Sequence, residues 1–135
     1  MPRFTRAADL QRHLEKALDR LQQETIITTQ AELSSTAVSP VDTGRFRSSW
    51  FAAEGNPSRD VAPEGTNSPN TDANGLRVRG TQTYYLSNSL PYAEAITVEG
   101  RVVSKPPSWF ASFRNSRIPK IQAAAARVVK QQFEL

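Results

Sequence analysis

The sequence predicts an α+β protein in which a long N-terminal helix is followed by a small antiparallel sheet and a C-terminal helix. Apolar residues recur at helical spacing over residues 7 to about 35 and again after residue 108, whereas β-branched and aromatic residues gather between 76 and 88. A chain of 135 residues without an internal repeat fits a single domain. Within that domain the expected divisions are 1–38, 39–54, 55–75, 76–104 and 105–135.

The first segment, 1–38, is expected to contain one long amphipathic helix, from Ala7 to about Ser35. The face of the helix opposite the apolar stripe is charged and contains like-charged side chains four residues apart. Packing against other elements must therefore hold the helix in place. His13, the only histidine, falls on this polar side and is predicted to be solvated. The apolar stripe follows spacings of three, four and seven residues and consists of Leu10, Leu14, Ala17, Leu21 and Thr28.

The segment 39–54 is predicted to form a rigid corner that ends in a strand through residues 51–53. Proline disfavours helix for the residue before it, Asp and Thr side chains bond nearby backbone amides, and glycine tolerates a positive φ. Two aromatic side chains then supply a large apolar area. Taken alone, this pattern is typical of a helix-to-strand connection. The residues expected to build the corner are Pro40, Asp42, Thr43, Gly44, Phe46 and Trp50.

Residues 55–75 are predicted to be a flexible loop or arm. The segment is rich in Pro, Gly, Asn, Ser and Thr, and Val61 is its only large apolar residue. Such a composition buries too little apolar surface to order itself, so we expect the segment to order only against a partner. Deletion of residues 57–74 is accordingly expected to leave a folded protein that no longer docks.

The segment 76–104 is predicted to supply strands over 76–80 and 81–88, then one helical turn over 90–96. A turn at Gly100 is expected to lead into a further brief strand. The last segment, 105–135, begins with two prolines that stop the preceding element, and Ser108 is a candidate N-cap for the C-terminal helix. Pro119 is expected either to kink this helix or to open a second one.

The composition argues against an enzyme and against a metal or cofactor site. The absence of cysteine excludes disulfides and thiolate ligands, and a single histidine cannot share a metal with a second one. No glycine-rich phosphate loop and no spaced pair of acidic residues stands out. No apolar run approaches the ~20 residues needed to cross a membrane. The N-terminus lacks a secretory signal, so we expect action in the cytosol or in an assembly built there.

Charge is distributed unevenly along the chain. The formal net charge is +4, which permits contact with nucleic acid without requiring it. The C-terminal helix is basic, and the middle loop is acidic. A solvated helix face is the favoured explanation of the basic residues, since cations near a helix C-terminus also favour the helix dipole. The candidate partner-binding residues are Arg59, Asp60, Glu64 and Asp72 in the loop, and Arg114, Arg117, Lys120 and Arg127 in the helix.

Two short blocks carry a family resemblance. Residues 40–50, Pro-Val-Asp-Thr-Gly-Arg-Phe-Arg-Ser-Ser-Trp, resemble the Pro-Val-Asp-Thr-Gly-x-Leu-Arg-x-Ser signature of tailed-bacteriophage neck and tail-completion proteins, the head–tail joining proteins similar to minor tail protein Z. Phe46 stands where an aliphatic residue is common. The second block of the family, Asn, then Pro-Tyr-Ala, then Glu-x-Gly, resembles the stretch 88–100, in which Val98 is often missing from the family. Its matching residues here are Pro91, Tyr92, Ala93, Glu99 and Gly100.

The resemblance implies a structural protein of the virion that is not an enzyme and needs no cofactor. Such proteins form a ring, usually of six copies, around the DNA channel at the head–tail junction, and connect a head-completion or adaptor protein to the tail terminator. DNA would pass through the channel without sequence-specific binding. The protein would be assembled in the host cytoplasm. The near alternative is a tail terminator or minor tail subunit of the same phage, and the distant one is a small basic nucleic-acid-binding module.

Overall fold

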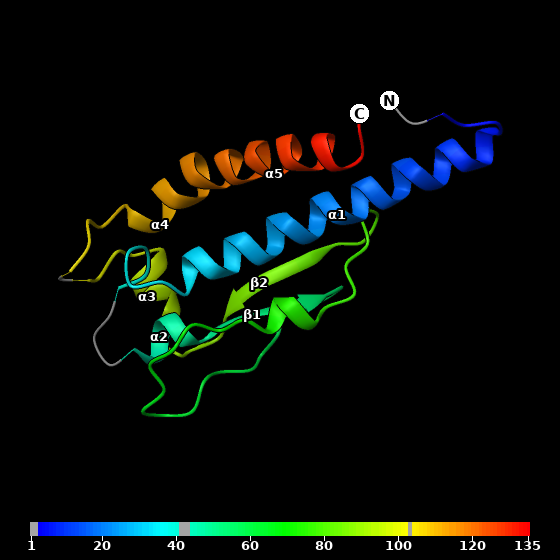
Figure 1. Cartoon of the computed structure of the whole chain (residues 1–135). Helices are drawn as coiled ribbons and strands as arrows, with labels where there is room; N and C mark the ends of the chain where they lie inside the picture. Colours follow the sequence, from blue (N-terminus) through cyan, green and yellow to red (C-terminus); the bar gives the residue numbers. More distant parts are fainter. Residues whose placement is uncertain (1–2, 41–43, 103) are drawn as a thin grey trace.

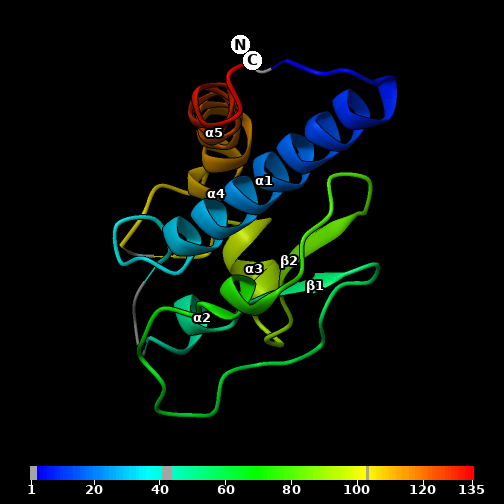
Figure 2. The ribbon, with the colours of Figure 1, turned by 45° about the vertical axis from the view of Figure 1, so that its right-hand side comes forward.

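The computed structural model describes residues 3–40, 44–102 and 104–135, and confirms the α+β class. The long helix α1 packs against a two-stranded sheet and against the C-terminal helix α5, which runs beside it in the opposite direction (Figures 1 and 2). Short helices connect these larger elements. The elements in chain order are α1 (Ala7–Leu33), α2 (Arg45–Ser48), β1 (Trp50–Glu54), the 3₁₀ turn η1 (Asp72–Gly75), β2 (Tyr84–Asn88), α3 (Ala93–Thr97), α4 (Trp109–Ser112), the π-helical turn η2 (Phe113–Arg117) and α5 (Ile118–Gln132).

The sheet is smaller than the sequence pattern predicts. Strands β1 and β2 pair antiparallel, with Ala52 opposite Leu86. The prediction of a strand over 76–80 is wrong, because the chain bends toward α1 there: the Gly80 amide donates to Asp19 Oδ1 at 2.8 Å, and Val78 is buried beneath the helix. The expected brief strand after Gly100 is also absent from the described residues, although Gly100 does turn the chain at φ +64°.

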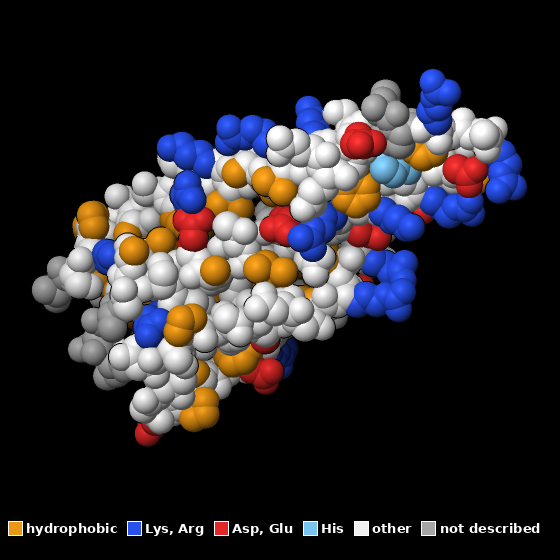
Figure 3. Space-filling model, viewed as in Figure 1, with side chains coloured by type: hydrophobic (Ala, Val, Ile, Leu, Met, Phe, Trp, Pro, Cys, Tyr) orange, Lys and Arg blue, Asp and Glu red, His pale blue; other side chains and the backbone are white. Residues whose placement is uncertain are grey.

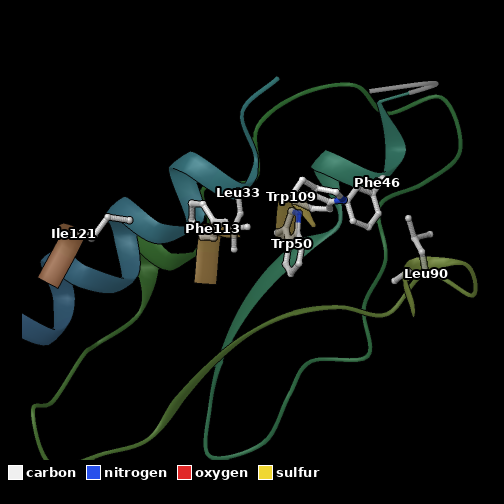
Figure 4. Close-up of a cluster of buried hydrophobic side chains, with 8 residues drawn as sticks. Leu33, Phe46, Trp50, Leu90, Trp109, Phe113 and Ile121 are labelled. Carbon is white, nitrogen blue, oxygen red and sulfur yellow. The ribbon is translucent and has the colours of Figure 1, made fainter. Parts of the chain in front are cut away.

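The main core lies where α1, β1 and the C-terminal helices meet. Trp50 is 3% exposed, and its ring stacks on Phe110 at 5.8 Å between centroids. Phe46 meets both Trp50 and Trp109 edge-on, an arrangement that aromatic rings favour (Figure 4). Pro119 lies in the first turn of α5, directly after the π-helical turn η2, and the chain is helical on both sides of it.

The amphipathic stripe of α1 is only partly buried. The C-terminal half of the helix covers the sheet, but Leu10 and Leu14 of the stripe, and Leu18 beside it, remain 40%, 41% and 51% exposed. The prediction that His13 is solvated is wrong. Its ring lies between those of Phe4 and Phe133, and Nε2 is 2.7 Å from the Phe133 carbonyl oxygen. The physical reason is that α5 packs along a second side of α1, which the single stripe does not predict.

The prediction that residues 55–75 cannot order themselves is also wrong. The segment packs on its own chain, with Ala62 and Ala73 buried at 3% and 0% exposure. Polar groups replace the missing apolar ones: the Ala62 amide donates to Ser49 Oγ at 3.0 Å, and the Ser68 amide donates to Ser48 Oγ at 2.9 Å. The segment is therefore part of the folded unit.

Candidate functional site

The two sequence blocks that carry the family resemblance meet in space. Asn88 Nδ2 donates to the Phe46 carbonyl oxygen at 2.8 Å, across forty-two positions of sequence. Phe46 also shares the main core with Leu90 and Ala93, which flank the proline of the second block. Pro91 and Tyr92 lie at the surface beside them. Together the blocks form a paired scaffold whose outer face includes Tyr92, 41% exposed.

The first block forms a tight, internally bonded corner. The Ser48 hydroxyl donates to the Gly44 carbonyl at 2.8 Å, and Trp50 Nε1 donates to Ser39 Oγ at 3.0 Å. The Ser39 hydroxyl in turn donates to the Leu33 carbonyl near the end of α1, at 2.5 Å. Pro40 is buried in this corner. The corner therefore fastens α1 to β1. The expected turn-capping residues Asp42 and Thr43 lie outside the described residues.

We expect Gly44→Ala to destabilise the fold by about 3 kcal/mol. Gly44 has φ +86°, a conformation that costs a residue with Cβ roughly 1–2 kcal/mol, and the new Cβ would lie 2.1 Å from the Asn67 side chain. Asn67 would have to move, which breaks the bond that it accepts from Arg47 Nε at 2.8 Å. Urea denaturation followed by circular dichroism measures this loss.

Gly65→Ala is the matched control for this prediction. Gly65 has φ +84° with nothing near the site of its missing Cβ, so alanine there should cost only the backbone strain, roughly 1–2 kcal/mol. Equal losses in the two variants would show that the Asn67 contact is unimportant.

The end of the second block brings two chain segments together. Gly100 is buried, and a Cβ on it would lie 2.4 Å from the Pro107 carbonyl oxygen. Glu99 is exposed and pairs with Arg101 at 2.9 Å. The glycine therefore has a packing role before α4, and Glu99 is a surface residue.

The candidate residues of the loop divide into two kinds. Arg59, Asp60 and Glu64 are exposed, with no side-chain partner in the described parts of the chain. Asp72 is instead engaged inside its own chain. Its carboxylate accepts hydrogen bonds from the Gln30 side-chain amide and from the Ala52 backbone N–H, the latter at 3.2 Å. The structure thus gives Asp72 a role in fastening η1 to β1.

The candidate cations of the C-terminal helices also divide. Arg117 makes a two-pronged contact with Glu32, at 2.6 and 3.0 Å, and this hydrogen bond, together with the charge of the carboxylate, raises the pKa of the Arg117 guanidinium. Arg114, Lys120 and Arg127 are exposed and have no partner among the described residues. Lys130, a further cation of α5, is likewise exposed and has no partner among the described residues. Figure 3 shows blue side chains along the α5 edge of the molecule.

An apolar groove adds a feature that the sequence pattern does not predict. It has a volume of about 320 Å³ and lies between α1, β2 and the α4–η2 segment. Ile26, Leu33, Leu86 and Phe110 contribute apolar walls, and Arg114 is a charged residue of the lining. Its walls come from segments far apart in sequence, so no local pattern could reveal it.

Within the described residues, no group of His, Asp and Glu side chains is arranged to hold a metal ion. No described helix is long and apolar enough to cross a membrane. Comparison with protein-family models, with curated proteins and with solved structures finds no match for this chain.

Proposed function

We propose that this chain is a structural component of a tailed-phage virion, and that it forms a ring at the head–tail junction between the adaptor proteins and the tail terminator. One observation carries the proposal: the two blocks that resemble the neck-protein family lie against each other, joined by the bond from Asn88 to the Phe46 carbonyl. Because the fold brings the two blocks into contact, they can act as one scaffold. This supports treating the two short resemblances as a single signature.

The surface offers separate places for neighbouring molecules. The cations Arg114, Lys120, Arg127 and Lys130 lie on the C-terminal helices, whereas Glu54, Asp60 and Glu64 lie on or beside the loop 55–75, and all are exposed. A ring needs a heterologous contact, in which one patch of a subunit meets a different patch of the next. Opposite charges on different elements are suited to such a head-to-tail contact.

Removal of the chain from a phage that encodes it tests this proposal. A nonsense mutation in the gene should give filled heads and complete tails that remain separate, because the connecting ring is missing. Supplying the chain from a plasmid should restore joined particles. Joined, infectious particles without the chain would refute the head–tail role, and normal heads with malformed or overlong tails would favour a tail terminator.

The exposed cations also favour a second candidate, a basic nucleic-acid-binding module. This candidate predicts that the isolated chain binds duplex DNA and that the logarithm of the binding constant falls steeply and linearly with the logarithm of salt concentration. Fluorescence anisotropy with a labelled duplex measures the slope. The ring proposal predicts no stable binding by the isolated chain at physiological salt.

A further inference from the structure

The two edges of the sheet differ in how their backbone groups are satisfied. On the outer edge of β1, Gln30 Nε2 donates to the Trp50 carbonyl at 3.0 Å, and the Ala52 N–H donates to Asp72 Oδ1 at 3.2 Å. Side chains from α1 and η1 therefore occupy the positions that another strand would take. This edge is closed to further pairing.

The same contacts define which groups of β2 point outward. Because Trp50 and Ala52 direct their backbone groups away from β2, the residues opposite them, Asn88 and Leu86, must direct theirs away from β1. The bond from the Gly55 N–H to the Thr83 carbonyl, at 2.9 Å, fits this alternation. Within the described residues, nothing hydrogen-bonds to the backbone N–H or C=O of Leu86.

The outer edge of β2 also lacks the usual protection against strand addition. Natural edge strands carry charged side chains, prolines or bulges that discourage pairing. The sequence of β2, Tyr-Tyr-Leu-Ser-Asn, has no charge and no proline. The apolar groove includes the side chains of Tyr84 and Leu86, so an added strand would have a place for its own apolar side chains.

We propose that the open edge of β2 and the adjoining groove bind an extended segment of another protein. The segment adds as a third strand, pairs its backbone with Leu86, and inserts apolar side chains at alternate positions into the groove. A carboxylate on the segment pairs with Arg114, which has no partner among the described residues. Such binding requires only the sheet and the groove and does not depend on the head–tail role.

The charge at the groove favours a different protein over a second copy of this chain. Two copies could pair through their β2 edges, but β2 carries no acidic side chain to meet Arg114. No acidic residue lines the groove itself. A strand with acidic side chains and with apolar side chains at alternate positions pairs with the backbone groups of Leu86, fills the groove and forms an ion pair with Arg114.

Selection from a displayed library of random nine-residue peptides tests the proposal on the full chain. Enriched peptides should alternate apolar and polar residues and contain Asp or Glu. When a synthetic copy of the best peptide binds, the NMR signals of the backbone amides of Tyr84, Leu86 and Asn88 should shift. Hydrogen exchange of the peptide amides that face Leu86 should slow. A copy with N-methyl groups on its pairing amides should lose binding.

Charge substitutions complete the test. Arg114→Glu should lower the affinity for the acidic peptide by about fivefold or more, since it removes an exposed ion pair worth about 1 kcal/mol. Arg127→Glu makes the same charge change on α5 away from the groove, and should alter affinity by less than about twofold. The proposal is overturned by a library without enrichment, by shifts confined to other elements, by equal effects of the two substitutions, or by a β2-mediated dimer in sedimentation.

Discussion

Trp50→Ala is expected to cost about 3–5 kcal/mol of unfolding free energy, a large share of the roughly 5–15 kcal/mol that a domain has in total. Trp50 is 3% exposed, stacks on Phe110 and donates to Ser39 Oγ. Its removal opens a cavity where α4, the corner and β1 meet, and leaves the Ser39 contact unmade. Urea denaturation followed by far-ultraviolet circular dichroism measures the loss without relying on tryptophan fluorescence.

Tyr92→Ala is the control for this aromatic truncation. Tyr92 is 41% exposed at the surface of the second block, so its removal should cost less than about 1 kcal/mol. If Trp50→Ala were no more destabilising than Tyr92→Ala, the corner would not be the anchor that joins the helices to the sheet.

Gln30→Ala is expected to cost about 3 kcal/mol and to release the loop 55–75. Gln30 is 1% exposed, donates to the Trp50 carbonyl, and accepts from the Ala73 N–H at 3.0 Å. Alanine leaves these buried groups without partners, at about 1–3 kcal/mol for each. Trypsin should then cut after the exposed Arg59 faster than in the unmodified chain, because local opening becomes easier.

Gln11→Ala separates this effect from the general effect of alanine in α1. Gln11 is exposed, and within the described residues its side chain hydrogen-bonds to Glu15 alone, so its substitution should leave both stability and the rate of tryptic cleavage nearly unchanged. An unchanged cleavage rate in Gln30→Ala would mean that the loop is held by other contacts.

The contacts of the loop contradict the expectation that deletion of residues 57–74 leaves a folded protein. Deletion of residues 57–74 would remove Asp72 and Ala73, which bind Gln30 and β1, together with the partners of Ser48 and Ser49. We therefore expect the deletion to destabilise the domain as a whole. Loss of docking in such a variant would not identify the loop as a docking site.

The fold class and the main helices could be predicted because they depend on local periodicity. The helical pattern predicts the end of α1 to within about two residues of its position in the structure. The strand predicted after the corner is also confirmed, as β1. The order of the loop could not be predicted in the same way. It is held by serine hydroxyls and by Gln30, and composition does not show which backbone groups such side chains will meet.

The misplacements of His13 and of residues 76–80 have a tertiary cause. Two different elements pack on α1, one along each of two sides, and a single apolar stripe describes only one of them. Of the candidate site, exposed cations such as Arg114 could be predicted from the basic C-terminal segment, in which Glu134 is the single acidic residue. Asp72 could not be recognised as internal, because its partners Gln30 and Ala52 lie far away in the sequence.

The most direct test of the proposed role is a cryo-electron microscopy map of the joined phage particle. The proposal predicts a ring of this fold between the head connector and the tail terminator, with α1 and the paired blocks around Phe46 and Asn88 recognisable in each subunit. A head–tail junction built entirely from other chains, or this fold found only elsewhere in the particle, would contradict it.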